Sequence, residues 1–132
     1  MSNLPVADLI VYAAAIMFLV MGVVTLIRPR TVSDTFGVPT ITPDMRNEIR
    51  AVYGGFGVFM CGLLLATFQY PETRNGVLLM VAVALLGMAA GRVIGFTIER
   101  PSGKWPYLYF VGEIILGALL LYARASSPTI FH

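Results

Sequence analysis

The sequence has little charge for its length. Only 12% of its 132 residues are charged, whereas 58% are hydrophobic and the mean hydropathy is +0.82. Soluble domains carry roughly a quarter charged residues, so a domain this small would lack an ordinary water-exposed surface. The composition therefore excludes a typical soluble enzyme and favours an integral membrane protein. The formal net charge of +2 comes from scattered residues and offers no basic patch for a nucleic acid.

Cysteine and histidine are equally scarce. The chain contains one cysteine, Cys61, and one histidine, so it cannot form an internal disulfide and shows no metal-ligand pattern. It also contains no phosphate-binding glycine loop and no nucleophile–base pair. We therefore expect no metal and no cofactor, and we interpret Cys61 as a small packing residue.

Long apolar runs are what the sequence has instead, each close to the ~20 residues that cross a bilayer. We predict helices over residues 6–28, 43–70, 73–99 and 105–124, with a short surface helix over about 31–36. Thr42-Pro43-Asp44 is a strong helix start, and Pro101-Ser102-Gly103 is typical of a turn. The predicted fold is an all-α, integral membrane four-helix up-down bundle that forms one domain over residues 1–132.

Lysine and arginine are unevenly distributed between the two ends of this predicted bundle. The end with the first and third connections carries Arg28, Arg30, Arg46, Arg50, Arg92, Arg100 and Lys104. The end with the two termini carries Arg74 and Arg124. Because basic residues concentrate on the cytoplasmic side, this bias predicts a multi-pass cell-membrane protein with cytoplasmic basic loops and both termini outside.

A charged residue, Arg92, interrupts the third apolar run. At 1.5 Å per residue it lies roughly 10 Å inward from Glu99. On their own helices, Arg50 lies roughly 12 Å from Thr42 and Glu113 lies roughly 12 Å from Trp105. In antiparallel helices these depths nearly coincide, so we expect the carboxylate and the two guanidiniums to pair. Two interpretations stay open: a structural clamp completed by Tyr53, and a cytoplasm-facing polar pocket.

Glycines accompany these charges. Gly87, Gly91 and Gly95 form a stripe beside Arg92 at four-residue spacing, which predicts helix packing. On the second helix, α-helical spacing places Arg50, Tyr53 and Gly54 on one stripe. Glu48 lies about 200° around from Arg50, so we expect it to reach water or to pair with Arg46.

The stretch Asn47-Glu48-Ile49-Arg50-Ala51-Val52-Tyr53-Gly54-Gly55 resembles a box in a family of small bacterial four-helix membrane proteins, a domain of unknown function of the 4345 type. Gly91-Arg92 and Glu113 are similar to the other characteristic polar positions of that family. The resemblance covers nearly the whole chain and implies a four-helix fold in the bacterial inner membrane. It implies no activity. It implies a shared role for Asn47, Glu48, Arg50, Tyr53, Gly54, Gly55, Arg92 and Glu113.

These features predict a small polytopic membrane protein whose polar pocket binds an amphipathic or lipid-like molecule, with an anionic head at Arg50 and Arg92. One alternative is an acid–base enzyme, of isomerase or cyclase type, acting on a terpenoid or sterol-like substrate. Glu113 would then be the acid or base and Tyr53 a donor. The other alternative is an accessory subunit of a larger membrane complex. The expected partners are the lipid bilayer, a hydrophobic small molecule and further copies of the chain.

Overall fold

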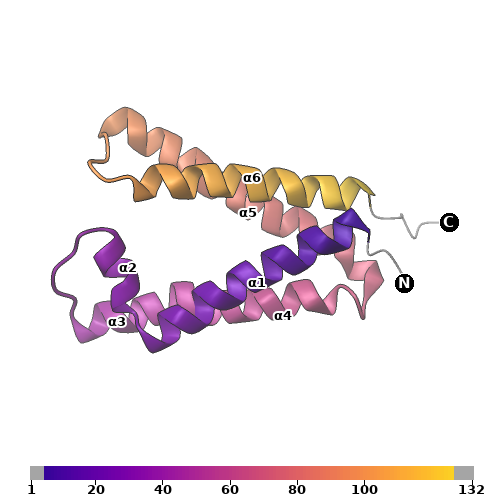
Figure 1. Cartoon of the computed structure of the whole chain (residues 1–132), viewed down its shortest axis with the longest axis horizontal. Helices are drawn as coiled ribbons and strands as arrows, with labels where there is room; N and C mark the ends of the chain where they lie inside the picture. The colour runs from indigo at the N-terminus through magenta and orange to yellow at the C-terminus, as the bar shows by residue number, and fades with distance from the viewer. Residues whose placement is uncertain (1–4, 127–132) are drawn as a thin grey trace. The chain divides into compact units, whose positions relative to one another are not determined.

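The computed structural model describes residues 5–126, which form helices joined by short connections (Figure 1). This part of the chain contains no β-strand, so the protein is all-α. The helices are α1 (Val6–Ile27), α2 (Arg30–Thr35), α3 (Pro43–Ile49), the π-helical segment η1 (Arg50–Gly55), α4 (Phe56–Ala66), α5 (Pro71–Ile98) and α6 (Trp105–Ser126). Since α3, η1 and α4 follow one another without a break, they make one long helix.

Four of these helices are long and apolar enough to cross a membrane. They are Val6–Ile27, Pro43–Ala66, Pro71–Ile98 and Trp105–Ser126. The shortest have 22 residues, or about 33 Å at 1.5 Å per residue, which exceeds the ~30 Å hydrocarbon core of a bilayer. The prediction of an all-α membrane protein with four spanning helices is confirmed.

Local sequence signals account for the helix ends. The hydroxyl of Thr42 accepts a hydrogen bond from the backbone N–H of Met45 at 3.2 Å and so caps α3. Gly37 follows α2 with a φ of 71°, a conformation that favours glycine. The second long helix ends at Ala66 rather than at residue 70, and α5 begins at Pro71 rather than at residue 73. Proline suits the first helical position, where its missing N–H would have no helical partner.

The chain divides into two compact units, which are described separately. One unit contains residues 12–66, and the other contains residues 1–11 and 67–132. The expectation that all four spans form a single transmembrane domain stays a prediction.

In the unit of residues 12–66, α1 packs against the long helix through glycines. A Cβ atom added to Gly22 would lie 2.6 Å from the backbone nitrogen of Val58. One added to Gly57 would lie 2.7 Å from the backbone oxygen of Phe18. The two backbones are therefore so close that only glycine fits between them. Beside this contact, the rings of Phe18 and Phe56 pack edge to face with their centroids 6.3 Å apart.

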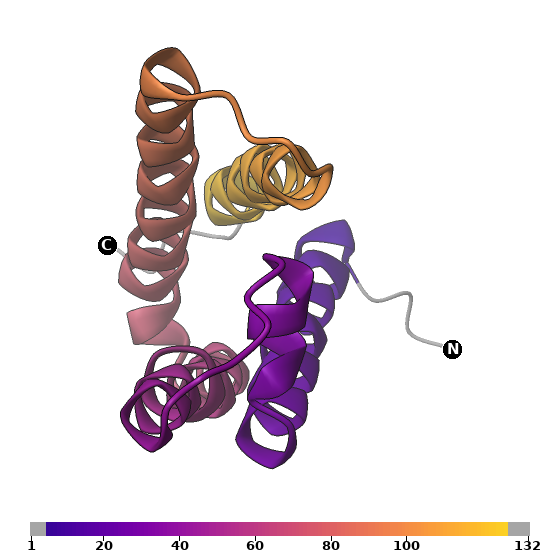
Figure 2. The ribbon, with the colours of Figure 1, turned by 90° about the vertical axis from the view of Figure 1, so that its left-hand side faces the viewer.

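The other unit is built on the α5–α6 hairpin and the first turns of α1. Figure 2 shows the connection that leads from the end of α5 to the start of α6. At the beginning of α5, Nη2 of Arg74 lies 2.7 Å from Oδ1 of Asp8 in α1. The same guanidinium lies over the ring of Phe68, with Cζ 5.3 Å from the ring centroid. An ion pair thus attaches the start of α1 to the start of α5.

Candidate functional site

Arg92 of α5 and Glu113 of α6 form a bidentate ion pair between two spanning helices. Nε of Arg92 donates to Oε1 and Oε2 of Glu113 at 3.0 and 2.9 Å, and Nη2 donates to Oε1 at 2.8 Å. The Glu113 side chain is 10% exposed, whereas that of Arg92 is 27% exposed. The carboxylate is therefore enclosed by the guanidinium, and the cation forms the more accessible side of the pair.

The packing of α5 on α6 explains why these two side chains meet. The buried residues of α5 lie on one face of the helix, at Leu78, Val81, Ala82, Leu85 and Ala89, and Arg92 follows Ala89 by three residues. On α6, Glu113 shares a buried face with Gly117, whose added Cβ would lie 3.0 Å from the side chain of Leu86. Because the helices approach closely at Gly117, the residues one turn away are brought within hydrogen-bonding distance.

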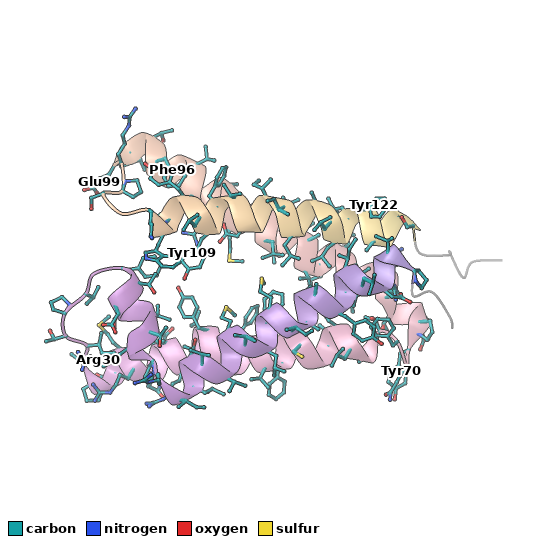
Figure 3. The ribbon with its side chains drawn as sticks, viewed as in Figure 1. Arg30, Tyr70, Phe96, Glu99, Tyr109 and Tyr122 are labelled. Carbon is teal, nitrogen blue, oxygen red and sulfur yellow. The ribbon has the colours of Figure 1, made fainter. Side chains whose placement is uncertain are left out.

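Aromatic rings surround the ion pair at the same end of the hairpin. The ring of Tyr109 has its centroid 5.4 Å from Cζ of Arg92, a cation–π distance. On the neighbouring face, Phe96 of α5 stacks on Tyr107 at 4.8 Å and meets Phe110 edge to face at 5.8 Å. Figure 3 shows Phe96 and Tyr109 at this end, with Tyr122 at the opposite end of α6. The sequence alone predicts that Tyr109 lies one helical turn from Glu113, because the two are four residues apart.

The role of Phe96 and Phe110 was missed from sequence. Phe96 follows Arg92 by four residues and so continues the face of α5 that packs on α6. That spacing is a signal that could have identified it.

The Asn47–Gly55 box contains a π-helical turn that the sequence did not predict. Buried residues along this helix are Ile49, Gly54, Gly57, Cys61 and Leu64. The first two are five positions apart, as in the i→i+5 hydrogen bonds of a π-helix, and the rest follow at α-helical intervals. The additional residue in the turn puts Ile49, not Arg50, in register with Gly54. Of the predicted stripe, Gly54 is buried whereas Arg50 and Tyr53 are exposed, so a common face for the three residues stays a prediction.

Arg50 is bound to the end of α1. Its Nε donates to the backbone oxygen of Leu26 at 3.0 Å. The last four carbonyl groups of a helix lack helical partners and carry partial negative charge, so a guanidinium stabilises them. Gly54 meets the same residue, because its added Cβ would lie 2.8 Å from the Leu26 side chain. Arg50 and Gly54 thus both contact the last turns of α1.

Asn47 and Glu48 are exposed, and neither side chain makes a hydrogen bond or ion pair with another residue of the described range. The alternative pairing of Glu48 with Arg46 does not occur, since Arg46 donates from Nη1 to the backbone oxygen of Ile41 at 2.9 Å. Arg50 and Tyr53 belong to a different unit from Arg92 and Glu113. A single cluster of all of these residues stays a prediction.

The stripe of Gly87, Gly91 and Gly95 makes no close packing contact of the kind seen at Gly22, Gly57 and Gly117. A Cβ atom added to any of the three would meet nothing within 4 Å, and all three residues are exposed. The close helix contacts therefore occur at other glycines, and packing through this stripe stays a prediction.

The arrangement offers charge and hydrogen bonding rather than a reactive group. Within residues 5–126 no three His, Cys, Asp or Glu side chains are grouped to hold a metal ion, and Cys61 is a buried free thiol. Both oxygens of Glu113 accept from Arg92. The site is therefore best suited to holding a polar or anionic group beside the guanidinium.

Comparisons with known proteins show the family of the chain. No curated protein and no solved structure is significantly similar to the chain. Residues 6–124 match a protein family described as a domain of unknown function, DUF4345. Because the match covers most of the chain, the chain belongs to the DUF4345 family.

Proposed function

We propose that this chain is a polytopic membrane protein that binds an amphipathic, lipid-like small molecule. The polar or anionic head of the ligand lies against the guanidinium of Arg92, and its apolar part lies along the apolar surface of the α5–α6 hairpin. Tyr109 and Trp105, whose ring centroids are 6.2 Å apart, flank the head on α6.

The unequal exposure of the ion pair carries this proposal. On two helices that are apolar enough to span a membrane, the Arg92 side chain is 27% exposed while its counter-ion is 10% exposed. A charged side chain on a membrane-spanning helix is unfavourable in hydrocarbon, and intramembrane charges mark binding sites for that reason. An anionic head group would meet the accessible side of the guanidinium.

The alternatives differ in what they require of Glu113. An acid–base enzyme of isomerase or cyclase type needs a carboxyl group that exchanges a proton with a substrate. A proton on Glu113 would disrupt its hydrogen bonds to Arg92, so no contact in the site favours this alternative. An accessory-subunit role requires a partner-facing surface and does not require the ion pair to be exposed.

The orientation of the chain in the membrane belongs to the same proposal. The bias of basic residues described above supports cytoplasmic connections after α1 and α5, with both chain ends outside. The site would then open toward the cytoplasmic leaflet, because Arg92 and Glu113 lie in the halves of α5 and α6 that adjoin the 99–104 connection.

Native mass spectrometry of the protein released from nanodiscs tests the proposal. The wild type should carry a small molecule that Arg92→Gln loses and that Arg100→Gln retains. Arg100 provides a matched control because it lies near the same connection, is exposed, and its side chain makes no hydrogen bond or ion pair with another described residue. Bare wild-type protein, or equal ligand retention by both variants, would refute the assignment. If Arg92→Gln fails to fold, Arg92→Lys keeps the charge without the bidentate geometry and should still bind more weakly.

A further inference from the structure

Residues 28–50, which comprise the connection after α1 and the first turns of the second long helix, carry four arginines. The segment contains Arg28, Arg30, Arg46 and Arg50 together with Asp34, Asp44 and Glu48. None of these arginines forms an ion pair with another residue in the range 5–126. Their charge is therefore available to an anion from outside the chain.

Backbone carbonyl groups hold three of these guanidiniums in fixed positions. Nη2 of Arg30 donates to the oxygen of Pro39 at 3.3 Å, and Nη1 of Arg46 donates to the oxygen of Ile41 at 2.9 Å. Arg50 binds the end of α1 as described above. A carbonyl orients a guanidinium, which has five N–H donors, without cancelling its charge. The arginines are thus pre-oriented cations.

Two of the arginines bind one short stretch of chain. The carbonyl groups of Pro39 and Ile41 are two residues apart, which is at most about 7 Å of extended backbone. Arg30 approaches this stretch from α2 and Arg46 approaches it from α3. Their guanidiniums are therefore held close to the same three residues, which suits a multidentate anion such as a phosphate.

The segment lies across the end of the spanning helices. Figure 1 shows α2 running across the direction of α1, and Figure 3 shows Arg30 at the end where α1, α2 and α3 meet. Because α1 spans the bilayer, this end of the unit lies at the membrane surface. Apolar side chains are exposed beside the arginines, at Phe36, Val38 and Met45.

We propose that residues 28–50 form a binding surface for anionic phospholipid head groups, separate from the Arg92 site. The arginines contact the phosphates, and the exposed apolar side chains enter the adjoining acyl region, as in interfacial segments of other membrane proteins. A net charge of +1 for these residues is too small for general attraction to dominate. Binding depends instead on where the guanidiniums are held.

The test uses the full chain in nanodiscs of equal phosphatidylglycerol and phosphatidylcholine, with retained lipids counted by native mass spectrometry. Wild-type protein should retain phosphatidylglycerol preferentially, and Arg30→Gln/Arg46→Gln should reduce that preference about tenfold or more, since one hydrogen bond between a guanidinium and a phosphate contributes roughly tenfold. The control Arg100→Gln/Lys104→Gln removes the same charge at the α5–α6 connection and should reduce it far less. Circular dichroism checks that both variants remain helical.

A second variant separates geometry from charge. Arg30→Lys/Arg46→Lys keeps the charge but cannot hold a carbonyl and a phosphate in the fixed fork of a guanidinium, so it should lose most of the preference. Full retention by this variant, an equal loss in the control, or no preference in the wild type would overturn the proposal. This test changes Arg30 and Arg46, whereas the ligand test changes Arg92, so this site and the proposed ligand site can fail independently.

Discussion

Breaking the Arg92–Glu113 pair from one side should destabilise the protein more than replacing both residues. Glu113→Gln preserves the shape of the side chain but removes its charge. Arg92 then keeps one neutral oxygen acceptor in place of a carboxylate that accepts three hydrogen bonds of 2.8 to 3.0 Å. The guanidinium of Arg92, on the apolar helix α5, then loses the carboxylate that it binds.

The structure sets the size of the effect. Removing one member of a buried ion pair typically lowers the free energy of unfolding by about 3–5 kcal/mol. Arg92 is 27% exposed and retains one acceptor, so we expect about 2 kcal/mol for Glu113→Gln. Hydrogen bonds between membrane helices average about 0.6 kcal/mol. A loss of about 2 kcal/mol in Glu113→Gln would therefore show that the charge of Glu113 contributes to stability. Arg92→Met/Glu113→Met removes both charges and should lie within about 1 kcal/mol of the wild type.

Unfolding in mixed micelles with rising dodecyl sulfate measures both quantities. Trp105 is the only tryptophan and begins α6, so its fluorescence reports on the hairpin that carries the pair. Arg100→Gln serves as the control for loss of a charge elsewhere. The reasoning fails if Glu113→Gln is as stable as the wild type, or if the double variant is as unstable as the sum of its single variants.

Three further substitutions test other contacts, each by the same unfolding measurement. Gly57→Ala should lower the free energy of unfolding by about 1–3 kcal/mol because its Cβ would lie 2.7 Å from the Phe18 carbonyl. Gly62→Ala, whose Cβ would meet no described residue within 4 Å, should raise it by about 0.5–1 kcal/mol. Equal effects of the two substitutions would contradict the helix contact. Asp8→Asn should destabilise by about 1–2 kcal/mol, since its pair with Arg74 is only 22% and 13% exposed, while Glu72→Gln in the same turn of α5 should be neutral. Thr42→Ala should destabilise by about 1 kcal/mol through loss of the cap on α3, and an unchanged midpoint would show that the cap is dispensable.

The sequence determined the spans and some of their ends. Four apolar runs can bury their backbone polar groups in a bilayer only as helices, and the cap at Thr42 and the glycine at Gly37 are local signals read without any neighbour. The ends at Ala66 and Pro71 were predicted at residues 70 and 73. The depths of Arg92 and Glu113 also followed from the helical rise, which is why their pairing was predictable.

Tertiary structure decided which residues share a face and which glycines pack. The π-helical turn inserts one residue into the helical period, so Ile49 replaces Arg50 in the buried stripe. Spacing alone also marked Gly87, Gly91 and Gly95, yet the close approaches occur at Gly22, Gly57 and Gly117. A glycine permits close approach on any helix, but only the packing of a second helix determines where that approach is made.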